Sequence, residues 1–347
     1  MVEMQAVVLD EWGGDLAVRS VERPEPGAGE VRVGVRACGV TRTIENAVAG
    51  GLSDDPNLTP RIPGHEFAGV VDAVGAGVDD VSVGDRVLAY FYLTCGHCDA
   101  CRRGDTAQCL DFGGWYGVHR DGGYAEYAVL PVENALPLPD GASFEEGAVA
   151  ADGVATPIHV CERAGVGDDD TVLVVGGAGR VGYHLAQVAG LRGARVLAAD
   201  VTDDRLAHAG SAGDHVAPVD ARRDDFAAAL GEATDHGDGP TVVVDTVGDL
   251  DTLRAAWDAL AMGGRVVSLT THHDRVFDAP MREYVVKEAA FLGSRYATRD
   301  EVVRAARMLA DGRVRADVTE RLSLDEVPDY HRRLREGDVH GMGVLVP

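Results

Sequence analysis

The hydrophobic positions of this chain follow two different periods. Over residues 4–36 apolar and polar residues alternate, and prolines and glycines interrupt the runs, which predicts short β-strands. From about residue 155 onward, short apolar runs alternate with segments of helical period. Strands that alternate with helices predict an α/β fold with a doubly wound parallel sheet, covered on both faces. The apolar runs occupy residues 172–175, 196–199, 242–244 and 265–269.

A glycine-rich turn joins the first of these apolar runs to a helical segment. We expect Gly177 to form the tight turn, Gly179 to let the backbone approach a pyrophosphate, and Gly182 to let the helix pack against the sheet. The next apolar run ends at Asp200, about 20 residues beyond the turn, where dinucleotide-binding units carry an acidic residue. The spacing therefore predicts a dinucleotide-binding βαβ unit with the phosphates at the start of its helix.

Asp200 favours NAD over NADP as the cofactor. A carboxylate at this position accepts hydrogen bonds from ribose hydroxyls and repels a 2′-phosphate, whereas Arg205 shortly downstream keeps NADP open. Further contacts are expected at the start of the helix and at the ends of later strands, because ligands bind at that edge of a doubly wound sheet. These residues are Arg180, Val181, Thr246, Val247, Ser268 and Leu269.

The chain is strongly acidic. Its 57 Asp and Glu residues outnumber 32 Lys and Arg residues, the formal net charge is −25, and Lys287 is the single lysine. Such a surface stays hydrated where salt is concentrated, which favours a halophilic source, with an ordinary acidic protein as the alternative. It disfavours nucleic acid and anionic membranes as partners. With 46% hydrophobic residues and no signal-peptide or membrane-spanning run, we expect a folded cytoplasmic protein.

Four of the six cysteines lie in one short segment. Their Cys-x2-Cys-x2-Cys spacing, with a fourth cysteine in a nearby turn, lets thiolates converge on one tetrahedral zinc ion. A closed four-sulfur site has no open position, so we expect it to be structural rather than catalytic. Unligated cysteines on a loop are the alternative. The four residues are Cys95, Cys98, Cys101 and Cys109.

Taken together, several motifs make the chain resemble the zinc-type alcohol dehydrogenases of the medium-chain dehydrogenase/reductase family, over residues 4–347. The resemblance implies a GroES-like β-domain at residues 1–153 and 295–347 with a zinc lobe at 93–112, and a Rossmann domain at 154–294. It also implies that hydride transfer to or from NAD(P) interconverts small alcohols and aldehydes or ketones, in a homodimer or homotetramer. The motifs, besides the cysteine segment, are Gly64-His-Glu66, Gly84-Asp-Arg-Val87, Gly122-Gly-Tyr-Ala-Glu-Tyr127, Gly177-Ala-Gly-Arg-Val-Gly182 and Gly263-Gly-Arg-Val-Val267.

The chain departs from this family at the catalytic metal. The family pattern is a cysteine ligand, any residue, a hydroxyl residue and an aspartate; here Thr41 replaces the cysteine and Ile44 the aspartate. By the same resemblance, Arg42 contacts the cofactor phosphate and Thr43 starts a proton relay. A threonine hydroxyl is a much poorer zinc ligand than a thiolate, and loss of the aspartate weakens the site further.

The family's other ligand positions are retained as His65, its neighbour Glu66, and Asp152. Three arrangements are open. Zinc binds through these three residues and water, or Cys38 replaces the missing cysteine as a ligand, or the site holds no metal and relies on Thr43 for proton transfer. Three aromatic residues are expected to line either the substrate pocket or the core: Phe91, Trp115 and Tyr116.

Three functions follow from these arrangements. The first is a zinc-assisted oxidoreductase of alcohols and carbonyl compounds. The second is a zinc-free reductase of activated carbonyls such as enones, whose oxygen needs only hydrogen bonds. The third is a nucleotide-binding pseudoenzyme that lost catalysis together with its ligands. The retained ligand positions favour the first function, whereas Thr41 and Ile44 favour the third.

Overall fold

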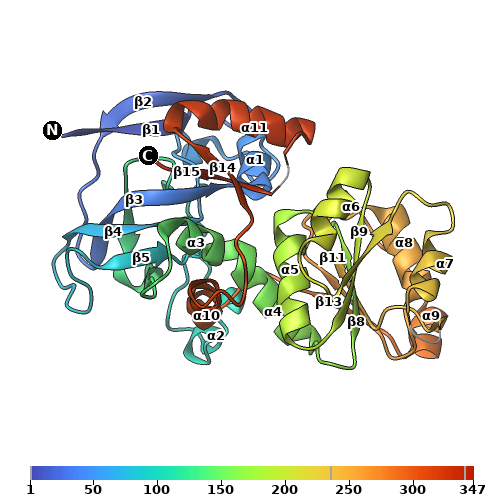
Figure 1. Ribbon diagram of the computed structural model, residues 1–347. Helices are drawn as coiled ribbons and strands as arrows, with labels where there is room; N and C mark the ends of the chain where they lie inside the picture. The colour runs from blue at the N-terminus through green and yellow to red at the C-terminus, as the bar shows by residue number, and fades with distance from the viewer. Residues whose placement is uncertain (1, 235–236, 273, 340) are drawn as a thin grey trace. The chain divides into compact units, whose positions relative to one another are not determined.

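The computed structural model describes residues 2–234, 237–272, 274–339 and 341–347. Within these residues the chain divides into two compact units (Figure 1). The first unit contains residues 1–155 and 297–347, and the second, here called the dinucleotide unit, contains residues 156–296. The boundaries expected from the sequence fall after residues 153 and 294, against 155 and 296 in the structure.

Antiparallel strands form the framework of the first unit. Strands β1 and β2 pair along their whole length, in the region where polar and apolar residues alternate. A second sheet runs in the order β14-β15-β3-β4-β5-β7, with β6 also paired to β3, so the end of the chain lies beside β3. The strands are β1 (Glu3–Leu9), β2 (Leu16–Glu22), β3 (Glu30–Val40), β4 (Phe67–Val74), β5 (Arg86–Ala89), β6 (Tyr127–Pro131), β7 (Ala135–Pro137), β14 (Val318–Leu322) and β15 (Met342–Leu345).

Several helices of the first unit begin at a residue whose side chain caps the helix N-terminus. Ser143 and Glu146 form a capping box at the start of α3, and Thr298 and Glu301 form one at the start of α10. After α3 the chain makes a π-helical turn, η4, and continues into α4, which leads into the dinucleotide unit. The bounds are α1 (Arg42–Val48), α2 (Asp99–Arg102), α3 (Phe144–Val149), η4 (Ala150–Val154), α4 (Ala155–Ala164), α10 (Arg299–Ala310) and α11 (Val327–Glu336), with 3-10 turns at Pro56–Leu58, Thr106–Gln108, Val132–Asn134 and Leu324–Glu326.

The dinucleotide unit contains a parallel sheet in the order β10-β9-β8-β11-β12-β13. This is the strand order of doubly wound dinucleotide-binding folds, the class of sheet that the sequence predicts. Figure 1 shows α5 on one side of the sheet and α8 and α9 on the other. The elements are β8 (Thr171–Val175), α5 (Arg180–Leu191), β9 (Arg195–Asp200), α6 (Asp203–Gly210), β10 (Val216–Asp220), α7 (Phe226–Glu232), β11 (Val242–Asp245), α8 (Leu250–Ala259), β12 (Arg265–Ser268), α9 (Met281–Lys287) and β13 (Ala290–Gly293).

The core of the dinucleotide unit lies between this sheet and α8. Leu173, Val243 and Val266 on three neighbouring strands are fully buried and belong to one apolar cluster with Trp257 of α8. Such packing fixes the strands, so the polar residues that follow them are presented along one edge of the sheet. No helix within the described residues has the length and apolar character that a bilayer crossing requires.

Candidate active site

A buried group of metal-ligating side chains lies beside β4 and the end of α3. His65 and Glu66 directly precede β4, and both are fully buried. Asp152 lies in the π-helical turn η4, a kind of turn that frequently occurs at functional sites. His65 Nε2 lies 3.3 Å from Glu66 Oε1 and 3.6 Å from Asp152 Oδ2. One donor atom of each residue lies within 4.8 Å of the others, so the structure brings these three residues together.

The spacing of these donor atoms fits a zinc ion. Nitrogen and oxygen ligands bind zinc at about 2.0–2.1 Å, so two ligands at a tetrahedral angle stand about 3.4 Å apart. The separations of 3.3 and 3.6 Å from His65 Nε2 are close to that value. An imidazole and two carboxylates are also ligands that zinc accepts, and three protein ligands leave a fourth position open for water or substrate.

Thr41 has a structural role at the position where the family carries a cysteine ligand. Its Oγ1 accepts a hydrogen bond from the Ile44 backbone N–H at 3.4 Å and so caps the N-terminus of α1. Ile44 itself is fully buried, and its Cδ1 would lie 3.1 Å from a Cβ added at Gly117. An apolar side chain therefore occupies the expected aspartate position, and it offers no hydrogen bond to orient His65.

Cys38 lies in β3, and its thiol is outside the cluster of donor atoms found around His65 in the described part of the chain. The side chain is fully buried. Burial, together with the nearby Glu66 carboxylate, raises the pKa of the thiol well above its usual range. The structure thus leaves Cys38 apart from the expected ligands.

Aromatic rings cover one side of His65. The Phe91 ring centre lies 4.3 Å from the imidazole centre, and the Trp115 ring centre lies 6.2 Å from it, both edge to face. Tyr116 is instead fully buried against Phe67, with ring centres 6.1 Å apart. Of the three aromatic residues singled out in the sequence, Phe91 and Trp115 therefore adjoin the candidate site, whereas Tyr116 belongs to the core.

Arg42 and Thr43 occupy the first turn of α1. Arg42 is exposed and Thr43 is half-buried. They share this turn with the cap made by Thr41 and with the buried side chain of Ile44. The position of the Thr43 hydroxyl is therefore set by how this end of the helix is anchored.

The cysteine lobe brings its thiols together around α2. The Cys95 and Cys101 sulfur atoms are 3.9 Å apart. Zinc–sulfur bonds of about 2.3 Å at tetrahedral angles place sulfur atoms about 3.8 Å apart, so the lobe fits a closed structural zinc ion. The backbone N–H groups of Cys101 and Leu110 lower the pKa of the Cys98 thiol to about 6, whereas burial raises the pKa of the Cys101 thiol to about 12, so the sulfur distances and not the pKa values carry the assignment of the lobe. The Sγ atoms within 4.8 Å of one another are those of Cys95, Cys98, Cys101 and Cys109.

The glycine turn follows β8 with one difference from the expected roles. Gly176, with φ of +83°, is the residue in the left-handed region, one position before the Gly177 to which the sequence assigned the turn. Gly177 lies against β9, where an added Cβ would stand 2.7 Å from the Ala198 Cβ. Gly182 packs α5 onto the turn, since its Cβ would lie 2.2 Å from the Gly176 oxygen. Gly179 is the N-cap of α5. The sequence carries two adjacent glycines, Gly176 and Gly177, and this pair could have indicated that the turn begins one residue earlier.

Asp200 ends β9 and connects it to the glycine turn. Its Oδ2 accepts a hydrogen bond from the Ala178 backbone N–H at 3.0 Å, and the residue is 5% exposed. The Arg205 guanidinium donates to Oδ1 through Nε at 2.6 Å, which makes an ion pair on the same carboxylate. Two predicted cofactor residues are therefore in direct contact.

The other predicted cofactor residues also lie along this edge of the sheet. Thr246 follows β11, and its hydroxyl donates to the Val175 carbonyl oxygen of β8 at 2.7 Å. Ser268 ends β12, and its hydroxyl lies 3.1 Å from that of Thr270. Val247 and Leu269 are the neighbouring residues beyond the two strands, and Arg180 and Val181 begin α5. A cavity of about 300 Å³ opens at the same edge, lined in part by Asp245, Ser268, Thr270 and His272.

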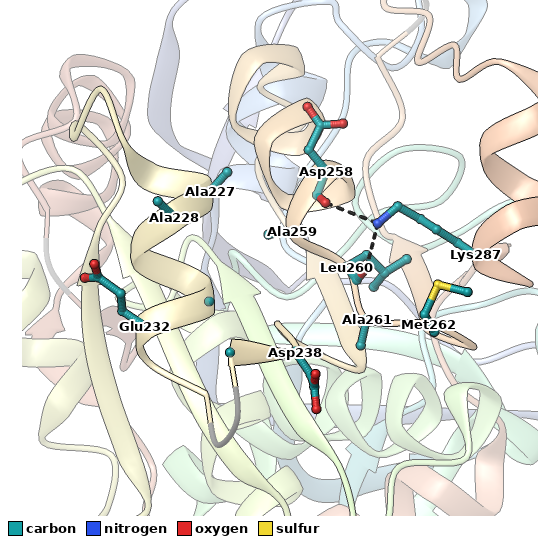
Figure 2. Close-up of a pocket in the computed structure, with 12 residues that line it drawn as sticks. Ala227, Ala228, Glu232, Asp238, Asp258, Ala259, Leu260, Ala261, Met262 and Lys287 are labelled. Atoms are coloured by element: carbon teal, nitrogen blue, oxygen red, sulfur yellow. Dashed lines mark hydrogen bonds between the residues drawn. The ribbon is translucent and has the colours of Figure 1, made fainter.

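A larger cavity, of about 640 Å³, lies at the opposite edge of the sheet. Figure 2 shows Lys287 reaching toward the end of α8, where Nζ donates to the carbonyl oxygens of Asp258 and Leu260 at 3.1 and 2.7 Å. Asp238 and Ala261 in its wall precede β11 and β12, so the cavity is at the amino ends of these strands. Ligands of doubly wound sheets bind at the carboxyl ends, so this cavity is separate from the predicted cofactor edge.

Comparison with known proteins identifies relatives along the whole chain. The model of the alcohol dehydrogenase GroES-like domain matches residues 27–140, and that of the zinc-binding dehydrogenase matches residues 181–311. An alcohol dehydrogenase of Geobacillus stearothermophilus is 32% identical over 346 residues, which cover 99% of either chain. An acryloyl-coenzyme A reductase of Metallosphaera sedula is 30% identical, again over 99% of both chains. The solved structure of a cobalt- and zinc-bound thermostable alcohol dehydrogenase from Pyrobaculum aerophilum matches all of both chains with a TM-score of 0.88 and 32% identity.

Replacing Cys98 by serine is expected to empty the cysteine lobe, because a neutral hydroxyl is a much poorer zinc ligand than a thiolate. Metal analysis should show a loss of about one zinc ion per chain, with a lower midpoint of thermal unfolding. Cys161→Ser is the control, since this buried cysteine lies in α4, outside the lobe. An unchanged zinc content in Cys98→Ser would contradict the assignment of the lobe.

Proposed function

We propose an activity for this chain on the premise that it belongs to the zinc-type alcohol dehydrogenase family and is an oxidoreductase. It interconverts small alcohols and the corresponding aldehydes or ketones, with NAD as the hydride carrier. The observation that supports this most directly is the buried group of His65, Glu66 and Asp152, whose spacing fits zinc with one position open.

The residues around His65, Glu66 and Asp152 have different roles in the proposed reaction. When zinc is bound there, it supplies a Lewis acid that lowers the pKa of the substrate hydroxyl. Phe91 and Trp115, packed on the His65 ring, keep water away from the donor atoms. Thr43 takes the alcohol proton and passes it outward, and NAD, when bound, would supply the hydride acceptor. Asn46, exposed one turn further along α1, cannot act as a base, so water completes the proton path.

The contacts of Asp200 favour NAD as the cofactor. In NAD-binding units a carboxylate at this strand end accepts hydrogen bonds from the adenosine ribose. Here Arg205 already forms an ion pair with Asp200, so a 2′-phosphate would meet a carboxylate and a guanidinium that is already paired with it.

The net charge of −25 and the cysteines, none of which forms a disulfide, support an enzyme that works in a salty, reducing cytoplasm.

A zinc-free reductase of activated carbonyls is the second candidate. Thr41 is engaged as a helix cap at the position of a family ligand, which weakens the case for a catalytic metal. One of the relatives is an acryloyl-coenzyme A reductase, whose substrate carries an activated double bond. In that reaction hydride adds to the carbon distant from the carbonyl, and Thr43 supplies the proton to the neighbouring carbon.

We also propose that two copies of the chain associate through the edge of the dinucleotide unit. β13 is the last strand of the sheet and has one side without a paired strand in the described residues. Beside it α9 exposes Met281 at 84% and Val285 at 74%, and Phe291 of β13 is 37% exposed. A second copy of this chain fits because pairing two identical edge strands satisfies both edges and covers both apolar surfaces.

Asp152→Ala should separate the zinc-assisted enzyme from the zinc-free reductase. If zinc is held as proposed, the wild type binds about two zinc ions per chain and the variant about one. The variant should lose alcohol oxidation while it retains NAD binding. Turnover is measured in molar salt from the absorbance of reduced nicotinamide, with a panel of alcohols and enones. Glu145→Ala is the control, because this residue precedes η4 in α3 and pairs with Arg321 at the surface.

One zinc ion per chain in the wild type, with turnover of enones alone, would favour the zinc-free reductase. No turnover with either substrate class, in spite of NAD binding, would favour the pseudoenzyme.

Asp200→Gly should shift the cofactor preference toward NADP, because it removes the repelling carboxylate and releases Arg205 to meet the 2′-phosphate. The ratio of kcat/KM for NADP over NAD should rise by roughly 10- to 100-fold, the size expected for one charge-assisted hydrogen bond. Asp220→Gly is the matched control, since this carboxylate also ends a strand and pairs with an arginine, Arg222. A preference that does not move would remove Asp200 from the cofactor site.

The double variant Met281→Asp, Val285→Asp should be monomeric, because it places charge on the apolar surface proposed to be covered. Light scattering after size-exclusion chromatography measures the mass of the wild type and the variant. Val83→Asp, which changes a residue 62% exposed in the first unit, should keep the mass of the wild type. A wild type with the 36.5 kDa mass of one chain would rule out the association.

A further inference from the structure

A buried pair of polar side chains connects the C-terminal helix of the first unit to the candidate active site. His331 of α11 is 1% exposed, and Tyr124 is fully buried. The Tyr124 hydroxyl lies 3.1 Å from His331 Nε2, and the two rings meet edge to face with centres 5.7 Å apart. None of the steps proposed above for the reaction uses either residue.

Tyr124 packs against the backbone segment that carries His65. A Cβ added at Gly64 would stand 2.4 Å from the Tyr124 ring and 2.9 Å from the Cys38 sulfur atom, so this stretch rests on the tyrosine. The backbone N–H of Tyr124 donates to the Pro63 carbonyl oxygen at 3.0 Å, and that of Gly123 donates to the Gly64 oxygen at 2.8 Å. The position of Tyr124 therefore fixes the backbone of residues 63–64, which directly precede His65.

The same tyrosine also adjoins the start of α1. Burial raises the pKa of the Tyr124 hydroxyl well above its usual range, and the backbone N–H of Thr41 acts in the opposite direction by donating to it. One turn further along α11, Arg335 Nε lies 3.2 Å from Glu45 Oε1 of α1, and Glu45 is 3% exposed. Figure 1 shows α11 alongside α1. The helix that carries Thr43 is thus anchored on α11 by the Arg335–Glu45 ion pair, and its N-cap residue Thr41 adjoins Tyr124, the partner of His331.

The chemistry of His331 argues against simple packing. Burial lowers the pKa of the imidazole to about 3, so the ring is neutral and has one nitrogen that accepts and one that donates. The Tyr124 hydroxyl and His331 Nε2 can share one hydrogen bond in either direction, according to which ring nitrogen carries the proton. The other ring nitrogen, Nδ1, is buried with no hydrogen-bond partner among the described residues. An apolar ring would pack here without that unfavourable burial, so the hydrogen bond to Tyr124 is the feature that the histidine supplies.

We propose that Tyr124 and His331 form a positioning pair of the active site, which holds the start of α1 with Thr43 in register with the backbone of His65. The pair touches neither substrate nor cofactor and acts through these two segments. This inference rests on the proposed function for its kinetic consequence, because Thr43 and His65 must face the same substrate. Its structural consequence, the anchoring of two backbone segments, holds for either candidate reaction.

Tyr124→Phe tests the pair by removing the hydroxyl and keeping the ring that supports Gly64. We expect kcat to fall by roughly 10- to 100-fold, the effect of displacing a reacting group by a fraction of an ångström to one ångström. KM for NAD and the zinc content should stay at wild-type values. His331→Phe should have the same effect, the double variant should be no slower than either single one, and His331→Gln, whose amide can still accept the hydrogen bond, should restore most of the rate.

Hydrogen–deuterium exchange provides a readout that does not depend on turnover. Peptides covering residues 38–48 and 62–67 should exchange faster in Tyr124→Phe and His331→Phe than in the wild type, and slower again in His331→Gln. The matched control is Tyr90→Phe, which also deletes a fully buried hydroxyl of the first unit. That hydroxyl contacts Thr106 Oγ1 at 2.8 Å and the Ala297 oxygen at 3.0 Å. The control should lower the unfolding midpoint while leaving kcat and the exchange of both segments unchanged.

Unchanged exchange in both segments, or faster exchange spread evenly over the first unit, would overturn the positioning role. A wild type that turns over neither alcohols nor enones would refute the proposed function alone, because the exchange data still decide whether the pair anchors the two segments. Altered exchange together with an unchanged kcat would also overturn the role assigned to the pair in the reaction.

Discussion

Burying two carboxylates beside an imidazole is the constraint on which the candidate active site depends. Like charges at such short range repel strongly where water is excluded, and a divalent cation relieves that repulsion. The fold holds Glu66 directly before β4 and Asp152 in a π-helical turn, with one oxygen of each close to the same His65 nitrogen, Nε2, while aromatic rings cover one side of the imidazole. A packed sheet and a capped helix therefore hold these three side chains in an arrangement that fits a cation.

Thr41, at the position of the family's cysteine, and Ile44, at that of its aspartate, stabilise α1 and do not serve a metal site. Thr41 contributes a cap that fixes the first turn of α1, and Ile44 contributes apolar packing in that turn. Both residues stabilise the helix that carries Thr43, but neither offers zinc a thiolate or orients an imidazole. A metal at this site would therefore need Glu66 as its third protein ligand, beside His65 and Asp152. Because the site lacks this thiolate and this aspartate, its side chains are compatible with both a zinc-assisted and a zinc-free reaction.

In the glycine turn of the dinucleotide unit, close backbone contacts explain why glycine occupies each position. Gly176 takes the left-handed conformation, Gly177 lies against β9, and Gly182 lets α5 reach the turn. Asp200 then connects β9 to this turn through the Ala178 amide. The carboxylate thus has a structural contact besides the place beside a ribose that the sequence predicts for it.

The sequence alone determined the features that depend on neighbours along the chain. Strand and helix periods, the glycine spacing and the cysteine spacing are local, and they predicted the α/β fold with its parallel sheet and the lobe whose sulfur atoms converge. Tertiary structure decided what depends on residues distant in sequence: Asp152 meeting His65, Arg205 engaging Asp200, Cys38 standing apart from the ligands, and Tyr124 reaching His331. The positive φ of Gly176 and the close approach of Ala198 in β9 to Gly177 belong to the same group, because the spacing of the glycines does not specify either. Spacing along a chain limits which side chains can serve a site, but only the packing of the elements determines which of them share one.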